Sequence, residues 1–252
     1  MRKPITIGDR PMDDILRSLK FINNRIKLAC NKSGRDISSV QLLLATKTVS
    51  AEKIKIALNC GEKLIGENKS QELKDKFEEL KLIPHQTHFI GHLQSNKIKE
   101  VLKYSQCIQS IDRIDLVQKL DQRLQKEGRT LDIMIQVNTS FEESKFGINP
   151  ANVLEFAEEV AAFDTLKVTG LMTIGLFSAE ESKVRKCFKL LNCLKSDLEV
   201  LQLPNFDLKE LSMGMSNDLE IAIEEGATII RVGTAIFGSR IYPDSYYWNE
   251  KQ

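Results

Sequence analysis

Short runs rich in apolar and β-branched residues alternate with segments of helical periodicity along nearly the whole chain. Several of these runs are apolar at consecutive positions rather than at every second one, which is typical of parallel strands covered on both faces. The short runs number eight in all: residues 41–47, 63–68, 87–92, 107–112, 131–139, 166–175, 209–215 and 228–234. The pattern therefore predicts eight interior strands.

Helix signals lie in the gaps between the runs, where apolar residues recur three and four positions apart. Side chains that favour helix starts precede several of these segments. The predicted starts are Ser50, Asn149 followed by Pro150, a capping box of Ser178 and Glu181, and Ser216. Gly61 and Gly226 follow the ends of two segments, as expected of helix C-termini. Each gap is long enough for one helix and two short loops.

Eight strand–helix units without a flexible linker predict a single α/β domain with a (β/α)8 TIM-barrel fold. Spacing alone leaves a doubly wound open sheet as the alternative. Within one domain spanning residues 1–252, we assign residues 1–34 to an extra N-terminal helix, 35–240 to the barrel and 241–252 to a tail. The amphipathic segment 11–33 is expected to plug or cover the bottom of the barrel.

The C-terminal tail is unusually aromatic. Residues 242–252 hold three of the four tyrosines and the only tryptophan of the chain. We interpret this segment as a staple that packs on the barrel wall. The alternative is an aromatic cluster that binds a partner.

Charge and composition narrow the class of ligand. The 252 residues include 36 Lys and Arg against 35 Asp and Glu, a formal net charge of +1. This balance supplies no long-range field for nucleic acid or an anionic membrane, so a small-molecule ligand is favoured. No apolar run approaches the roughly 18 residues that span a bilayer, and residues 1–11 lack the apolar core of a secretory signal. We expect a cytoplasmic protein.

The cysteines and histidines do not indicate a disulfide framework or a metal site. The five cysteines, none in a CxxC pair, are interpreted as buried small apolar groups: Cys30, Cys60, Cys107, Cys187 and Cys193. His85 and His88 are an odd number of residues apart and would face opposite sides of a strand, and no carboxylate shares the spacing of His92. The motifs GxGxxG and GxxxxGK[ST] are absent, so dinucleotide and P-loop sites have no support either.

Lys47 is the most informative candidate for chemistry. It directly follows the apolar run LLLA, and the working side chains of such barrels lie at the carboxyl ends of the strands. Desolvation and nearby cations at a barrel mouth would lower the pKa of this amine and free it for Schiff-base chemistry. The alternative is a lysine that reaches out to solvent.

A phosphate site is predicted at the ends of the last two strands. The segment Ser212-Met213-Gly214-Met215-Ser216 leads into a helix, and Gly233-Thr234 follows the eighth run. Glycines let backbone N–H groups approach an anion, and hydroxyls add donors. Barrels often bind phosphate with the loops after strands seven and eight. Simple turn chemistry, with Ser216 as an N-cap, is the alternative.

Arg231 lies among apolar residues in the eighth run, TIIRVGT. A buried guanidinium needs an acceptor, which could be a carboxylate or a ring nitrogen of a ligand. The sequence leaves both possibilities open.

Six strings together carry a family resemblance. They are LLLATKT, IGENKSQEL, HFIGHLQSNK, IQVNTSFEESKFGI, GLMTIG and LSMGMSNDLEIAIEEGATIIRVGTAIFG. In this order and spacing, from about residue 10 to residue 242, the chain resembles the pyridoxal phosphate homeostasis proteins, the PLP-binding YggS/PROSC-type family. The resemblance implies a single barrel like the N-terminal domain of alanine racemase, with pyridoxal 5'-phosphate (PLP, a form of vitamin B6) at its mouth.

The resemblance also implies roles for individual residues. Lys47 corresponds to the lysine that holds PLP as a Schiff base (internal aldimine), and Arg231 to the residue facing the pyridine nitrogen. The ring site would be formed by Asn68, His88, Ile90 and Met172. The phosphate cradle would be formed by Ser212, Gly214, Ser216, Gly233 and Thr234. Two departures, Asn217 where relatives often have Asp or Ala and Val49 where a Lys is frequent, do not threaten cofactor binding.

Arg231 favours a non-catalytic function. An arginine at the pyridine nitrogen stays charged and leaves that nitrogen unprotonated, which weakens PLP as an electron sink. Racemases of this fold add a tyrosine base from a C-terminal domain, and we expect no such domain here. We therefore expect a protein that stores, buffers or carries PLP and that holds no metal. PLP-dependent apo-enzymes would be its transient partners. We expect a monomer or a weak homodimer. A PLP-dependent racemase or lyase is the main alternative, and a Schiff-base aldolase acting on a phosphorylated substrate is the other.

Overall fold

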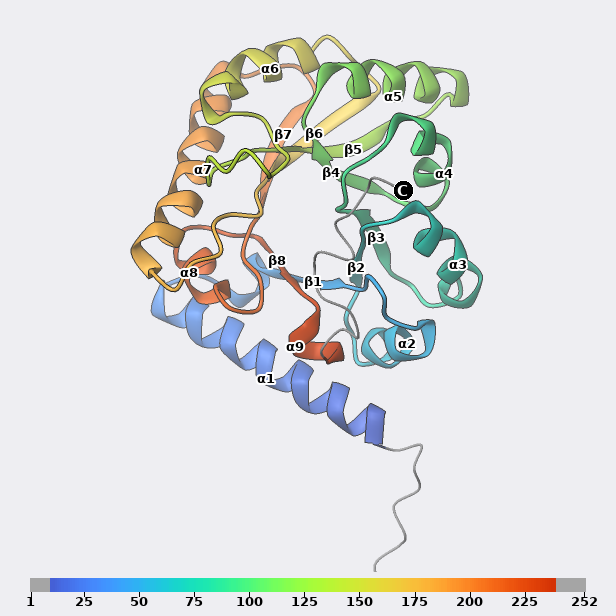
Figure 1. Cartoon of the computed structure of the whole chain (residues 1–252), viewed down its shortest axis with the longest axis vertical. Helices are drawn as coiled ribbons and strands as arrows, with labels where there is room; N and C mark the ends of the chain where they lie inside the picture. Colours follow the sequence, from blue (N-terminus) through green and yellow to red (C-terminus); the bar gives the residue numbers. More distant parts are fainter. Residues whose placement is uncertain (1–9, 239–252) are drawn as a thin grey trace, which may run out of the picture.

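Eight parallel strands close into a barrel in chain order, from β1 to β8 and back to β1 (Figure 1). This computed structural model describes residues 10–238. The strands are β1 (Gln41–Ala45), β2 (Leu64–Glu67), β3 (Gln86–Phe89), β4 (Cys107–Ile111), β5 (Leu131–Gln136), β6 (Leu166–Met172), β7 (Phe206–Ser212) and β8 (Ile229–Val232). The pairing of β1 with β8 confirms the predicted barrel and excludes the open sheet.

Helices follow the strands and form an outer layer (Figure 1). They are α1 (Arg10–Lys32), α2 (Ala51–Asn59), α3 (Ser70–Leu80), α4 (Ile98–Tyr104), α5 (Ile114–Glu127), α6 (Val153–Val160), α7 (Glu181–Leu201), α8 (Leu219–Glu224) and α9 (Thr234–Phe237). Short 3-10 turns, η1 (Ile37–Ser39), η2 (Ser95–Lys97) and η3 (Pro150–Asn152), precede β1, α4 and α6. The strands are buried on both faces because the helices cover the outside while side chains fill the inside.

Two apolar layers result from this arrangement. Outward-facing strand residues such as Leu42 and Leu44 join the helices in the larger core. A smaller cluster fills the barrel itself: Leu43, Leu64, Cys107, Met134, Met172 and Ile229. Consecutive apolar residues in one strand therefore serve different cores, which is why the runs lack alternation.

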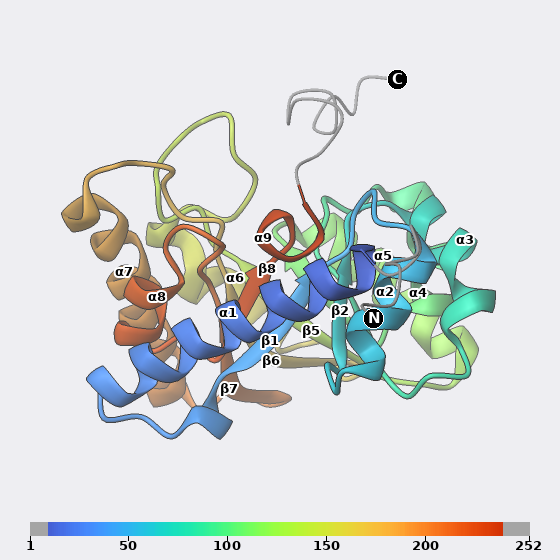
Figure 2. The same cartoon turned by 90° about the horizontal axis from the view of Figure 1, so that it is seen from below.

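Helix α1 does not plug or cover the bottom of the barrel, so that prediction is wrong. It packs against α8 and α2 on the side of the barrel, and closes the ring of helices there (Figures 1 and 2). The reason is the shortness of α9, which spans only Thr234–Phe237 and cannot cover the outer face of β8 and β1. Buried residues of α1 such as Ile15, Ile22 and Ile26 fill the place of an eighth outer helix.

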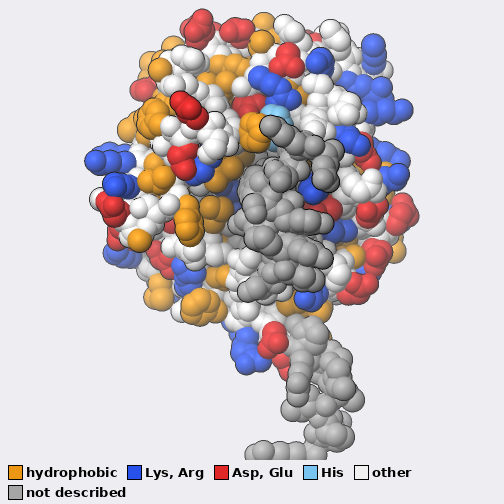
Figure 3. Space-filling model, viewed as in Figure 1, with side chains coloured by type: hydrophobic (Ala, Val, Ile, Leu, Met, Phe, Trp, Pro, Cys, Tyr) orange, Lys and Arg blue, Asp and Glu red, His pale blue; other side chains and the backbone are white. Residues whose placement is uncertain are grey.

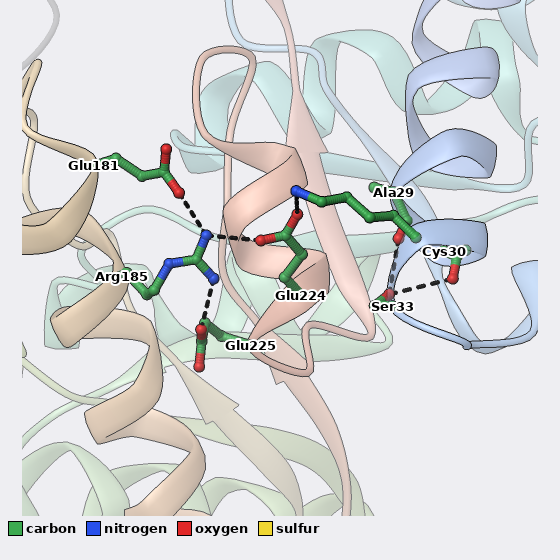
Figure 4. Close-up of polar contacts among 8 residues, drawn as sticks. Ala29, Cys30, Ser33, Glu181, Arg185, Glu224 and Glu225 are labelled. Carbon is green, nitrogen blue, oxygen red and sulfur yellow. Dashed lines mark hydrogen bonds and ion pairs between the residues drawn. The ribbon is translucent and has the colours of Figure 1, made fainter.

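Charged side chains hold α1 and α7 on α8. Arg25 of α1 donates from Nε and Nη2 to the two carboxylate oxygens of Glu220, at 2.6 and 2.7 Å. Glu224 of α8 accepts from Lys32 of α1 and from Arg185 of α7, at 2.6 and 2.7 Å (Figure 4). Glu224 thus connects α1, at the start of the chain, to α7 and α8, which come late in it.

Replacing Arg25 with methionine is expected to lower the free energy of unfolding by about 1 kcal/mol, because a half-buried bidentate pair is lost while the apolar stem is kept. The matched control is Arg17→Met on the same helix. Within residues 10–238, Arg17 forms an ion pair only with the exposed Asp14, so its loss should have no measurable effect. Urea denaturation of both variants measures the difference, and equal effects would contradict the prediction.

Two predicted helix starts are wrong. Ser178 accepts a hydrogen bond from the backbone N–H of Glu180 within the preceding loop, and α7 begins only at Glu181. Ser216 does not cap α8 either, because the helix begins only at Leu219 and its N-cap residue is Asp218. Asn149 does cap a turn, but this is η3, which precedes α6.

The interpretation of the cysteines holds for three of them. Cys30, Cys107 and Cys187 are buried, but Cys60 and Cys193 are exposed, because they lie on the outward sides of a helix end and of α7. All five are free thiols. The assignment of a tail at residues 241–252, including the proposed staple, lies outside the described residues.

Candidate functional site

A cavity of about 250 Å³ lies at the carboxyl ends of the strands. Eight of the predicted binding residues line it: Lys47, Asn68, Ile90, Met172, Ser216, Arg231, Gly233 and Thr234. They come from several different strand ends, as the barrel closure requires. Asn217, one of the two departures from relatives, lines it as well, and so do Asp218 and Phe177, to which the sequence did not point.

Arg231 is held rigidly at the back of this cavity. Its side chain projects from β8, is buried, and donates from Nη1 to Ser212 Oγ at 2.8 Å and from Nη2 to the carbonyl of Thr173 at 2.7 Å. Burial lowers the pKa of Arg231 to about 10, which still leaves it charged at neutral pH. Among the described residues no carboxylate lies within 4.0 Å of it, so no close ion pair of the kind that the sequence left open is formed, although the charge of Asp218 in the same lining acts to raise the pKa of Arg231. Because Arg231 lines the cavity, a ligand there could supply a further acceptor to its guanidinium.

A directed chain of hydrogen bonds runs behind Arg231. A guanidinium can only donate, so Ser212 Oγ accepts from it and gives its own proton to Gln109 Oε1 at 2.6 Å. Gln109 must then donate from Nε2 to His88 Nδ1, at 2.7 Å. His88 is therefore a neutral imidazole protonated on Nε2, and its burial lowers its pKa to about 4. The chain fixes the orientation of Arg231 through residues that do not line the cavity.

Three predicted binding residues lie away from this cavity. Ser212 and His88 belong to the chain behind Arg231, and His88 lines a second cavity of about 280 Å³ at the amino ends of the strands. Gly214 has φ +90°, and a Cβ there would lie 2.4 Å from Ala222 Cβ. The glycine thus allows the loop to pack on α8.

The lining offers complementary groups for a small ligand. It combines the amine of Lys47, the guanidinium of Arg231 and the hydroxyls of Ser216 and Thr234. Asn68 Oδ1 is buried and, within the described part of the chain, has no hydrogen-bond partner. Ile90, Met172 and Ile174 provide apolar walls. These groups suit a flat ring that carries an aldehyde, a ring acceptor and a phosphate, which is the donor and acceptor pattern of PLP.

The surface around the site has mixed charge. Lys and Arg side chains lie interspersed with Asp and Glu around the rim of the face in Figure 3.

Across residues 10–238, His, Cys, Asp and Glu side chains form no group of three or more that could hold a metal. No helix in the same part of the chain is both long and apolar enough to cross a membrane.

Comparison with known proteins gives the family. The family model for the alanine racemase N-terminal domain matches residues 45–241. The pyridoxal phosphate homeostasis protein of Aquifex aeolicus (strain VF5) is 42% identical over 224 residues, covering 89% of this chain and 97% of the relative. The protein of the same name from Escherichia coli (strain K12) is 37% identical over 234 residues, 92% of this chain and 99% of the relative. The chain belongs to the pyridoxal phosphate homeostasis protein family.

Solved structures agree with this assignment. The structure of PipY of Synechococcus elongatus PCC7942 with PLP bound has a TM-score of 0.75 and 33% identity, covering 86% of this chain and 100% of PipY. Alanine racemase of Clostridium difficile 630 has a TM-score of 0.74 at 11% identity, covering 92% of this chain and 58% of the racemase. The second likeness shows the fold alone. The resemblance seen in the sequence, to a homeostasis protein with a racemase-like barrel, is confirmed.

Proposed function

We propose that this member of the pyridoxal phosphate homeostasis protein family binds PLP in the cavity at the barrel mouth and stores, buffers or delivers it. The observation that carries the proposal is the meeting of Lys47 and Arg231 in one cavity with Ser216, Gly233 and Thr234. The PLP bound in the PipY structure supports the choice of ligand.

The lining residues divide the work of binding. The Lys47 amine would hold the aldehyde carbon as a Schiff base, a C=N bond that replaces the C=O bond with loss of water. Arg231 would donate to the ring nitrogen, while Ser216, Gly233 and Thr234 would hold the phosphate. Asn68 would supply its unpartnered oxygen to a ring donor. PLP, when bound, supplies an electrophilic carbon and an electron-accepting ring.

The lining favours a carrier over an enzyme. Arg231 cannot pass a proton to the ring nitrogen without losing a charge that it keeps at neutral pH. An unprotonated ring nitrogen is a weak electron sink. Within the described lining, Asp218 is the only carboxylate and no His, Cys or Tyr is present, so candidates for a second base are few. Asp218 already accepts a hydrogen bond from the backbone N–H of Met215.

Replacing Lys47 with arginine is expected to abolish the visible absorption band that PLP gives on forming a Schiff base, because a guanidinium keeps the charge but cannot form that bond. Borohydride reduction followed by peptide mass spectrometry should label Lys47 in the wild type and no other lysine. Lys53→Arg on the exposed side of α2 is the control and should stay yellow. A yellow, reducible Lys47→Arg protein would contradict the covalent role of Lys47.

Turnover separates the carrier from an enzyme. Incubation of PLP-loaded protein with alanine or serine should give no racemisation or elimination above the rate of free PLP. Turnover that depends on Lys47 would overturn the non-catalytic part of the proposal and leave PLP binding intact.

For the compartment we propose the cytoplasm, because five free thiols, two of them exposed, are typical of a reducing environment.

A further inference from the structure

A charged cluster that is buried at one end and half-buried at the other lies behind the loop that carries Lys47. It consists of Glu67 at the end of β2 and of Glu72 and Lys76, one turn apart on α3. The side chains of Glu67, Lys76 and Glu72 are 1%, 13% and 20% exposed. Glu67, Glu72 and Lys76 are absent from the lining of the PLP cavity, so direct contact with the ligand does not explain them.

The cluster holds both peptide groups that flank Lys47. Lys76 Nζ donates to the carbonyl of Thr46 at 2.8 Å, and this carbonyl belongs to the peptide group before Lys47. Glu72 Oε2 accepts from the backbone N–H of Thr48 at 2.7 Å, and this N–H belongs to the peptide group after it. Residues of α3 thus fix the backbone on each side of Lys47.

The cluster is tied together internally. Lys76 Nζ donates to Glu67 Oε1 and to Glu72 Oε2, both at 2.7 Å, so its three protons have three acceptors. Thr46 Oγ1 also donates to Glu67 Oε1, at 2.6 Å. A lysine with all donors committed has one orientation, and it transmits that orientation to the Thr46 carbonyl.

The loop needs such support. Thr48 has φ +64°, a left-handed conformation that a β-branched residue rarely adopts. Such conformations persist where surrounding contacts impose them. Without the bond to Glu72, Thr48 would relax toward negative φ and turn the peptide group beside Lys47, which changes the direction of the Lys47 side chain.

We infer that Glu72 and Lys76 are positioning residues that present the Lys47 amine to the PLP cavity and so slow the release of PLP. The inference rests on the proposed function, because it takes Lys47 as the residue that bonds the aldehyde. Fixing the backbone of one residue corresponds to about a tenfold change in an equilibrium constant. Loss of the clamp should therefore raise the PLP dissociation constant about tenfold.

Glu72→Ala is the main test, with two ligands measured side by side. PLP carries the aldehyde, whereas pyridoxine 5'-phosphate carries an alcohol at that position and can bind only through its ring and phosphate. Glu72→Ala should release PLP about tenfold faster and bind pyridoxine 5'-phosphate as the wild type does. Glu72→Gln keeps an acceptor oxygen for Thr48 and should restore most of the PLP affinity. Amide exchange at Thr48 in the ligand-free protein should accelerate in Glu72→Ala.

Two further variants complete the design. Lys76→Met should resemble Glu72→Ala. Glu79 lies on the same helix and, in the described part of the chain, forms an ion pair with Lys55 alone, so Glu79→Ala should behave as the wild type. Equal losses of affinity for both ligands, or unchanged PLP release in Glu72→Ala, would overturn the inference. A wild type that binds PLP no more tightly than pyridoxine 5'-phosphate would instead overturn the covalent role of Lys47, and the clamp with it.

Discussion

Replacing Gly91 with alanine is expected to lower the free energy of unfolding by about 3 kcal/mol and to disturb the PLP cavity. A Cβ at Gly91 would lie 2.1 Å from the carbonyl oxygen of Asn68 and 2.7 Å from its Cα. Both atoms belong to the backbone after β2, so no side-chain rotation can relieve the clash. Asn68 must therefore move, and Asn68 itself lines the cavity. Urea denaturation and PLP titration measure the two effects.

Gly128 provides the matched control for this substitution. It ends α5 with φ +62°, and no neighbouring atom of the described residues lies within 4 Å of the position that a Cβ would take. Gly128→Ala should therefore cost only the strain of the left-handed backbone, about 1 kcal/mol, and leave PLP binding unchanged. If Gly91→Ala costs no more than Gly128→Ala, the close approach of the two loops does not matter.

The fold was predictable because the barrel buries both faces of its strands. Leu42, Leu43 and Leu44 are all buried, although neighbouring side chains face different cores, and consecutive apolar residues are the visible trace of this geometry. β7 begins at Phe206, earlier than the predicted run, because the exposed Asp207 interrupts the apolar pattern at the start of the strand. The place of α1 could not be predicted, since it depends on how little of the outer barrel face α9 covers.

The site was predictable where a residue lies at a strand end. Lys47, Asn68 and Arg231 were found in this way, and the cavity unites them. The supporting residues were missed because their partners are distant in sequence. Lys76 contacts a carbonyl 30 residues away, within a helix whose sequence SQELKDKFEEL is typical of an ordinary charged surface. Gln109 left a fainter signal, because it and Ser110 are polar residues between the apolar ends of a short strand whose five residues are all buried.

Two buried groups should give the protein opposite pH dependences of stability. Burial lowers the pKa of His88 to about 4, so the unfolded chain takes up a proton near pH 6.5 that the folded protein refuses. The contribution of His88 to the free energy of unfolding is therefore complete above pH 6.5 and is lost as the pH falls toward 4. Burial raises the pKa of Glu67 to about 7, and its Oε2 is buried with no hydrogen-bond partner among the described residues. Its stabilisation is complete below pH 4.5 and is lost as the pH rises toward 7.

Between pH 4.5 and 6.5 these two contributions should nearly cancel in the wild type and separate in single variants. In His88→Asn only Glu67 still titrates, so the free energy of unfolding should decrease as the pH rises, relative to the wild type. In Glu67→Gln only His88 still titrates, so the free energy of unfolding should increase as the pH rises. With a slope of about 1.4 kcal/mol per pH unit for each group, the two variants should diverge by about 5 kcal/mol over this range. Urea unfolding at pH 4.5, 5.5 and 6.5 measures it, and comparison at equal pH removes the other titrating groups. Parallel curves for the two variants would mean that neither buried group titrates as its surroundings require.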